Sequence, residues 1–233
     1  MNSSGFDEKD LPELLRFFNR PRTVYIRSLF SHLAGSDESI HDEFTLNQIH
    51  LFENMTTTIQ AHFNYKIWRH ILNSAGIERF PQYHFDMVRL GIGLHGISSD
   101  HALLRPVSTF KTHISSIREV PTGQSIGYGR KSYTDRPSRI AVIPVGYADG
   151  LNRHLSNRVG EVYVKGKKAP IIGNICMDTC MIDITDTDAL VGEEVEIFGK
   201  HIPVTEIADK LGTIPYEILT GVSSRVKRVY YKE

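Results

Sequence analysis

The fold is decided by the stretch Met87-Val-Arg-Leu-Gly-Ile-Gly-Leu-His-Gly96, which places one arginine, Arg89, inside an apolar segment with the character of a β-strand. Such a segment is normally buried, and a buried guanidinium is unfavourable unless its donors are hydrogen-bonded. The glycines at 91, 93 and 96 would let a ligand approach the backbone closely. The stretch therefore predicts a strand whose end faces a polar ligand. The alternative is a barrel strand whose arginine pairs with a structural carboxylate.

The segments before this stretch alternate between helical and strand patterns. Helices are expected at 11–18, opened by Asp10, and at 42–63, where apolar residues recur with helical spacing. Strands are expected at 23–33, 65–72 and 87–95, with a loop at 73–76. This order indicates parallel βα units, in which ligands gather at the carboxyl ends of the strands. The polar and glycine residues at or near those ends, which we expect to converge, are His32, Asn73, Ser74, Arg89 and Gly91.

The pattern changes after Arg105-Pro106 to short β segments separated by turns. The expected strands are 108–120, 139–145, 160–164, 169–184, 193–198 and a closing strand at 225–231. A short helix is expected from Thr205 as its cap to Gly212 as its stop, and another at 215–219. We therefore expect two domains, an α/β domain at 1–105 and a compact antiparallel β domain at 106–233.

Composition narrows the class of protein. The 233 residues include 27 basic and 27 acidic side chains, so there is no general attraction to nucleic acid or to an anionic membrane. No apolar run approaches the ~20 residues that span a bilayer, and the first residues lack the features of a signal peptide, which favours a cytoplasmic protein. Cys176 and Cys180 have no zinc-like partners; on one continuous strand they would be too far apart to bridge, so we expect buried or site-lining thiols and no metal.

Several sequence motifs occur in the order found in one known enzyme family. They are Ser31-His32-Leu33-Ala34 with Asp37-Glu38, Asn73-Ser74, Met87-Val-Arg-Leu-Gly-Ile, Ile126-Gly-Tyr-Gly-Arg, Pro144-Val-Gly-Tyr-Ala-Asp-Gly, Gly173-Asn-Ile-Cys-Met-Asp and Val222-Ser-Ser-Arg-Val. Together they resemble the alanine racemases over essentially the whole chain. The resemblance implies an isomerase that uses pyridoxal 5′-phosphate to interconvert L-alanine and D-alanine, which supplies D-alanine for peptidoglycan.

The resemblance assigns roles to residues of the α/β domain. Arg89 is similar to the arginine that faces the pyridine nitrogen of the cofactor, where a permanent cation discourages protonation of that nitrogen. His32 is similar to a histidine that supports this arginine; taken alone, it would be read as a core histidine. The positions that resemble the cofactor and phosphate anchors are Asn73, Ser74, Gly91 and Ile92.

The resemblance also assigns roles in the β domain. Tyr128 is similar to the acid/base on one face of the substrate carbon, a residue that reaches into the site of a partner subunit and so implies a homodimer. Taken alone, Tyr128 would be a tyrosine at a strand edge. Tyr147 resembles a tyrosine of the substrate entrance. Cys176, Met177 and Asp178 resemble a loop that touches the substrate, with the Met177 amide near its carboxylate, although these three residues alone could be plain β core.

The chain also departs from the family pattern. No segment resembles the family's Schiff-base lysine, which serves the other face of the substrate carbon. Ser3 stands where the family has an arginine, and Ser224 where some members have a phosphate-binding tyrosine. The sequence thus resembles the last three βα units of a (β/α)8 barrel followed by the β domain, and three strands cannot close such a barrel.

Three hypotheses follow from the sequence. The chain is the C-terminal part of an alanine racemase, inactive when alone, whose homodimer or a second chain completes the site. It is instead a non-catalytic binding or interaction module derived from a racemase, or half of a split enzyme. The weakest alternative is a related pyridoxal-phosphate barrel enzyme such as an amino-acid decarboxylase, because the loop motifs are of the racemase kind.

Overall fold

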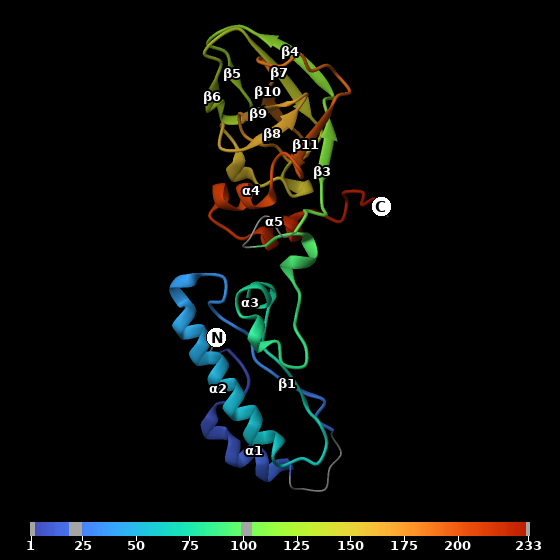
Figure 1. Ribbon diagram of the computed structural model, residues 1–233. Coiled ribbons are helices and arrows are strands. Elements are labelled where there is room, and N and C mark those ends of the chain that lie inside the picture. Colours follow the sequence, from blue (N-terminus) through green and yellow to red (C-terminus); the bar gives the residue numbers. More distant parts are fainter. Residues whose placement is uncertain (1–2, 19–24, 99–103, 232–233) are drawn as a thin grey trace. The chain divides into compact units, whose positions relative to one another are not determined.

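A computed structural model describes residues 3–18, 25–98 and 104–231 (Figure 1). The chain divides into two compact units, residues 1–105 and residues 106–233. We describe each unit by itself. The first combines helices with a short parallel sheet, and the second is built on an antiparallel sheet.

The helices of the first unit follow closely from its sequence. They are η1 (Glu8–Asp10), α1 (Leu11–Phe18), η2 (Ser39–His41), α2 (Asp42–Gln60), α3 (Ser74–Arg79), η3 (Pro81–Tyr83) and η4 (Ile92–His95). Helix α2 buries Ile49, Phe52 and Ile59 along one face, as its helical spacing predicts. Phe44 and Leu51 are exposed in the structure, so its apolar face is narrower than the sequence suggested.

Two strands, β1 (Ser28–Phe30) and β2 (Trp68–His70), pair in parallel, with Phe30 opposite His70. Both strands are shorter than expected, because the two segments pair over three residues only. Two apolar clusters pack against this sheet and α2. Their buried members are Leu33, Ile49, Phe52, Ile71, Leu72 and Phe80 in one cluster, and Leu11, Ile59, Phe63 and Ile67 in the other.

The expected third strand, 87–95, is wrong. Residues 87–90 are irregular and η4 begins at Ile92, because hydrogen bonds from Leu94 N–H to Gly91 and from Gly96 N–H to Gly93 close turns there. The segment still runs beside β2, since the Arg89 N–H donates to the Leu72 carbonyl at 2.9 Å.

Two helix starts in the first unit also differ from the sequence reading. The loop expected at 73–76 is the start of α3, whose N-cap, Asn73, accepts a hydrogen bond from the Gly76 N–H. The helix expected to open at Asp10 is preceded by η1, and Asp7 begins the helical segment. In both places a short polar side chain next to a helix end satisfies backbone groups that periodicity does not reveal.

The second unit contains an antiparallel sheet that closes on itself. Within the described residues its order is β3-β11-β8-β9-β10-β7-β4. Strands β3 (Phe110–His113) and β4 (Ser116–Val120) are successive parts of one segment, and between them Ile114 bonds to Glu193 while Ser115 bonds to Val142. The segment therefore changes partners at 114–115 and joins the two edges of the sheet.

The remaining strands of this sheet agree with most expected β segments. They are β7 (Ser138–Ile143), β8 (Glu161–Val164), β9 (Lys167–Ile172), β10 (Cys180–Asp183) and β11 (Glu194–Phe198), and a separate hairpin joins β5 (Ser125–Ile126) to β6 (Ser132–Tyr133). The expected strand 169–184 is two strands separated by a loop at 173–179. Cys176 therefore lies in a loop and Cys180 in β10, rather than on one continuous strand.

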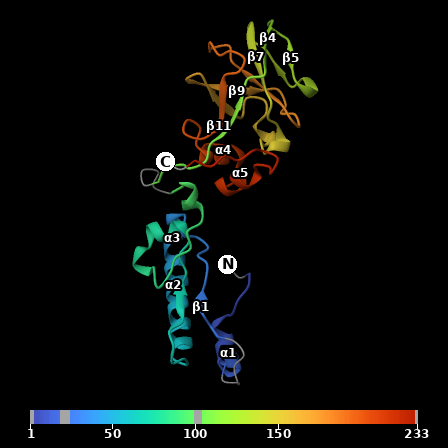
Figure 2. The ribbon, with the colours of Figure 1, turned by 90° about the vertical axis from the view of Figure 1, so that its right-hand side faces the viewer.

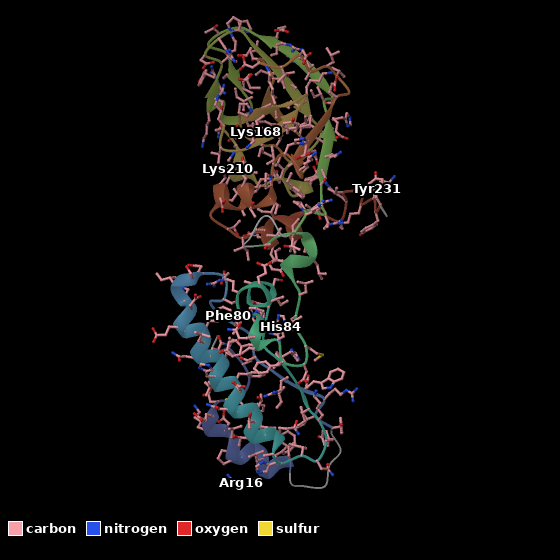
Figure 3. All side chains as sticks on the ribbon, in the orientation of Figure 1. Arg16, Phe80, His84, Lys168, Lys210 and Tyr231 are labelled. Carbon is pink, nitrogen blue, oxygen red and sulfur yellow. The ribbon has the colours of Figure 1, made fainter. Side chains whose placement is uncertain are left out.

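Helices α4 (Val204–Leu211) and α5 (Pro215–Gly221) lie together at one end of this sheet (Figures 1 and 2). Helix α4 ends at Gly212, as predicted, but its N-cap is Pro203 and not Thr205. Glu206 of α4 accepts from Lys168 of β9, and Lys210 of α4 pairs with Glu161 of β8, which ties the helix to the sheet (Figure 3).

The closing strand predicted at 225–231 is irregular chain, because no strand bonds to it in the described part of the protein. The described ranges also contain no helix long and apolar enough to cross a membrane.

Candidate functional site

Arg89 is held by a ring of neutral acceptors. Its Nη2 donates to the backbone carbonyls of Ser31 at 2.6 Å and Ile71 at 3.1 Å, and its Nη1 donates to the His70 carbonyl at 3.3 Å. The ring nitrogens Nδ1 of His70, at 2.6 Å, and of His32, at 3.1 Å, are the other acceptors. Among the described residues no carboxylate pairs with Arg89, so they give no support to the structural ion pair, the alternative for this residue.

Both histidines are kept neutral by their surroundings. Burial lowers the pKa of His32 and of His70, and the neighbouring Arg89 cation lowers it further. A neutral imidazole accepts at one nitrogen only, and in His70 Nδ1 does so while Nε2 lies 3.4 Å from the Ser28 hydroxyl. Burial also lowers the pKa of Arg89, which remains far above neutrality for a guanidinium. The cluster therefore carries one uncompensated positive charge.

The loop that carries His32 is fixed by a single glutamine of α2. Gln48 Nε2 donates to the His32 carbonyl at 2.6 Å, and its Oε1 accepts from the Ala34 N–H at 3.2 Å. Phe30, the last residue of β1, stacks on His70 with a centroid separation of 5.3 Å and faces the Arg89 guanidinium at 5.4 Å. His32, His70 and Arg89 thus meet near the ends of the strands, as the sequence predicted for His32 and Arg89.

A second cluster of polar groups contains Ser74, Asn73 and the turn at residues 91–93. The buried Ser74 hydroxyl accepts from the N–H groups of Gly91 at 2.9 Å and of Gly93 at 3.2 Å. Asn73 Oδ1 accepts from the Ser36 hydroxyl at 2.8 Å and caps α3. In the described part of the chain the Ser74 hydroxyl proton and the Ile92 N–H have no acceptor. Both remain able to donate to an anion.

In the second unit, Tyr128 stands on a loop that only glycines can form. Gly127 and Gly129 on either side have φ of 72° and 73°, and the Tyr128 side chain is 76% exposed. Its backbone carbonyl accepts from Asn174 Nδ2 at 2.6 Å, and Asn174 Oδ1 in turn accepts from Asn157 Nδ2 at 3.1 Å. The loop is tied at its backbone, and no described residue hydrogen-bonds to the phenol.

The other expected residues of this unit lie on two loops that run together. The Tyr147 N–H donates to the Cys176 carbonyl, and the Ala148 N–H donates to the Met177 carbonyl, both at 3.0 Å. Asp178 pairs with Arg225, one residue after Ser224, at 2.6 Å. The structure therefore brings Tyr147, Cys176, Met177, Asp178 and the Ser224 segment into one region.

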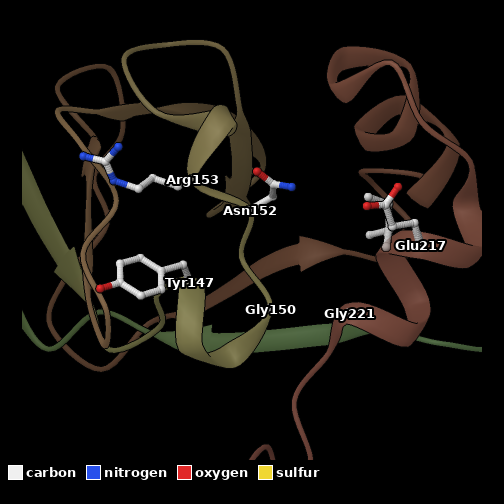
Figure 4. A pocket seen from close by; sticks show the side chains of 7 residues that line it. Tyr147, Gly150, Asn152, Arg153, Glu217 and Gly221 are labelled. Atoms are coloured by element: carbon white, nitrogen blue, oxygen red, sulfur yellow. The ribbon is translucent and has the colours of Figure 1, made fainter.

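A pocket with a volume of about 480 Å³ opens beside this region (Figure 4). The residues that line it are Tyr147, Gly150, Asn152, Arg153, Glu217, Ile218 and Gly221. Tyr147 and Arg153 lie on one side of Asn152 and Glu217 lies on the other (Figure 4).

Sequence reasoning missed some residues of these clusters. His70, Ser31 and Gln48 all hold Arg89 or its neighbour His32, and Asn174 and Arg225 hold the loops of the β unit. His70 could have been suspected because it ends the second strand, where ligand-facing residues gather. The others act through backbone atoms or distant partners and leave no periodic signal.

Comparison with known protein families covers almost all of the chain. The family model of the alanine racemase C-terminal domain matches residues 107–230, and that of the alanine racemase N-terminal domain matches residues 1–99. The chain belongs to the alanine racemase family. Alanine racemase 2 of Caldanaerobacter subterraneus subsp. tengcongensis is 42% identical over 99% of this chain, and alanine racemase of Desulfovibrio desulfuricans is 41% identical over 89%.

Solved alanine racemases share this fold. The enzyme of Streptomyces coelicolor A3(2) superposes with a TM-score of 0.91 at 32% identity and covers 100% of this chain. That of Bartonella henselae, solved with covalently bound pyridoxal phosphate, has a TM-score of 0.88 at 34% identity over 99% of the chain. The predicted fold, a partial (β/α)8 barrel followed by an antiparallel β domain, is confirmed. The chain spans 62% of the Caldanaerobacter protein and 64% of each of these two structures.

Proposed function

We propose that this chain supplies the C-terminal part of an alanine racemase, which interconverts L-alanine and D-alanine with pyridoxal 5′-phosphate. The observation that carries the proposal is the Arg89 cation, whose acceptors in the described part of the chain are all neutral. Family membership supports the reaction, and the Bartonella relative binds this cofactor.

The residues of the first unit fit this cofactor. Arg89 keeps a full positive charge where the family places the pyridine nitrogen, and a permanent cation there would keep that nitrogen unprotonated. The Ser74 hydroxyl and the Ile92 N–H both have a proton to donate to the phosphate, and Asn73 holds Ser74 at the start of α3. When bound, the cofactor acidifies the proton on the substrate carbon. His32 and His70 keep Arg89 in place.

The residues of the second unit fit the substrate. Tyr128 Oη would take or return the proton on one face of the substrate carbon, and its exposed phenol is free to do so. The Met177 N–H has no acceptor in the described ranges and would bind the substrate carboxylate. Tyr147 and Cys176 would line the route to it, and Ser224 would add a hydroxyl near the phosphate. We propose that Tyr128 acts in the site of a second copy of the chain, so the active form is a homodimer.

The opposite face of the substrate carbon needs a second base. In the family this is the lysine that holds the cofactor, and no segment of these 233 residues matches its motif. A polypeptide limited to these residues is therefore proposed to be inactive by itself. Either a longer chain or a second chain would have to supply the lysine.

The experiment compares this polypeptide with a protein that also carries a lysine-bearing N-terminal racemase segment. Each is incubated with pyridoxal phosphate and L-alanine, and D-alanine is measured by chiral chromatography. We expect D-alanine only from the second protein, with loss of turnover in its Tyr128→Phe variant. Turnover by the 233 residues alone would refute the proposed inactivity. Cofactor binding without any turnover in either protein would favour a non-catalytic binding module.

A further inference from the structure

Arg225, in the segment after α5, has no part in the proposed reaction, yet it joins two loops that do. Its Nε donates to Asp149 Oδ1 at 2.7 Å, and its Nη2 donates to Asp178 Oδ1 at 2.6 Å. One guanidinium thus bridges carboxylates that lie 29 residues apart in the sequence, as positions 149 and 178 show. Burial of Asp149 raises its carboxyl pKa, but hydrogen bonds from Arg225 and Gly146 outweigh this and lower it, so Asp149 stays ionised.

Asp149 is fixed on both sides. Its Oδ2 accepts from the Gly146 N–H at 2.9 Å, and its backbone carbonyl accepts from the Ser223 N–H at 3.1 Å. Asp149 therefore connects the Tyr147 loop with the segment that carries Ser224 and Arg225. Without the arginine, the carboxylates of Asp149 and Asp178 would face each other across a short gap with no cation between them.

The two loops are also in backbone contact. A Cβ at Gly146 would lie 2.3 Å from the carbonyl oxygens of Cys176 and Met177, so the loops touch without a side chain between them. Hydrogen bonds from Tyr147 N–H and Ala148 N–H occupy those two carbonyls. The Met177 N–H, on the same loop, has no acceptor among the described residues.

We propose that Arg225 is a positioning residue, which clamps the 176–178 loop to the Tyr147 loop and so holds the Met177 N–H ready for the substrate carboxylate. The inference rests on the proposed function for its substrate, but its structural part concerns this chain alone. A pre-set donor binds without a further ordering cost, so loss of the clamp should weaken substrate binding more than it slows turnover.

The structural part is tested by hydrogen exchange on the purified chain. In Arg225→Gln the Tyr147 and Ala148 amides should exchange about tenfold faster, because local opening becomes easier when charge-assisted hydrogen bonds are lost. Arg225→Lys should give a smaller increase, since its ammonium keeps the positive charge but cannot make both hydrogen bonds of the guanidinium. The matched control is Arg136→Gln, which breaks the exposed Arg136–Asp186 pair and should leave these amides unchanged. Asp178→Asn weakens only the Arg225–Asp178 contact and leaves Asp149 in place. The same measurement is made on this variant if Arg225→Gln fails to fold.

The kinetic part uses the protein that also carries the lysine-bearing segment. Arg225→Gln should raise KM for alanine by about tenfold or more while kcat changes little, with partial rescue in Arg225→Lys. Unchanged amide exchange in a folded Arg225→Gln variant would overturn the clamp, and an equal fall in kcat with constant KM would overturn its role in substrate binding. If the unsubstituted protein does not racemise alanine but the amides respond, the proposed function fails and the clamp stands.

Discussion

Arg89 Nη1 lies 2.6 Å from Nδ1 of His70, so a guanidinium and a neutral imidazole share a short hydrogen bond in a partly buried site. The pairing is unusual because an arginine in such a place is commonly neutralised by a carboxylate. Here the neighbouring acceptors are backbone carbonyls and a second histidine, and the positive charge is kept. That retained charge is what the proposed cofactor would use.

Arg89→Lys should destabilise the first unit by roughly 1–3 kcal/mol, because a single ammonium cannot reach the carbonyls and rings that the guanidinium bridges. Urea unfolding of this unit, followed by the fluorescence of Trp68, measures the effect. Arg16→Lys is the control, since Arg16 is exposed and, among the described residues, bonds to the nearby Pro12 carbonyl. Equal stability of the two variants would show that the ring of acceptors contributes nothing.

The stability of the first unit should fall as the pH drops below about 6.5, the usual pKa of a histidine. The pKa values of His32 and His70 are lowered in the folded state, so the unfolded chain binds protons first. Their contribution is present above the unfolded pKa and is lost as the pH falls through the folded pKa. Thermal unfolding at several pH values should show a weaker acid dependence in His70→Gln. The same dependence in both proteins would contradict the assignment.

Gly127→Ala should destabilise the β unit more than Gly123→Ala does. Both glycines have a positive φ, 72° and 78°, and Gly127 also has a ψ of −176°, a combination that is essentially restricted to glycine. A Cβ at Gly127 would also lie 2.9 Å from Met181 Cε, whereas a Cβ at Gly123 meets open space. The difference in unfolding free energy between the two variants measures the backbone strain and the crowding at Gly127 together. No difference would mean that the Tyr128 loop shifts freely.

Cys176 should react with iodoacetamide in the folded protein, and Cys180 should not. Burial raises the pKa of the Cys180 thiol to about 12, and its side chain is inaccessible in β10. The thiolate is the reactive form of a thiol, and with this pKa almost no Cys180 thiolate is present at pH 8. Mass spectrometry of the native chain should find one modification, absent in Cys176→Ser. Rapid double labelling without unfolding would contradict the buried position of Cys180.

Limited proteolysis of these 233 residues should remove the first unit before the second. The described part of the first unit contains a sheet of only two strands, in which Phe30 of β1 and Trp68 of β2 are exposed. Such an edge is poorly protected, whereas the sheet of the second unit closes on itself through Ile114 and Ser115. Fragments should therefore begin near residue 106. Equal protection of both units in a monomer would argue against this difference.

Local sequence patterns predicted much of the fold. The apolar spacing of 42–63 predicted α2, short β segments after residue 105 predicted most strands of the sheet, and Gly212 predicted the end of α4. The order of motifs identified the family, which the comparisons confirm. These features depend on residues that are close in the sequence, which is why periodicity and capping patterns can predict them.

The tertiary structure decided the rest. The irregular path of 87–90, the acceptors of Arg89 and the fork of Arg225 all depend on hydrogen bonds between segments far apart in the chain. Ser31 and Arg89, for example, are 58 residues apart and meet through a backbone carbonyl, which every residue possesses and no side-chain pattern marks. The sequence by itself predicted which residues would carry the chemistry. Only the folded chain decided which neutral groups hold Arg89 and leave its charge uncompensated.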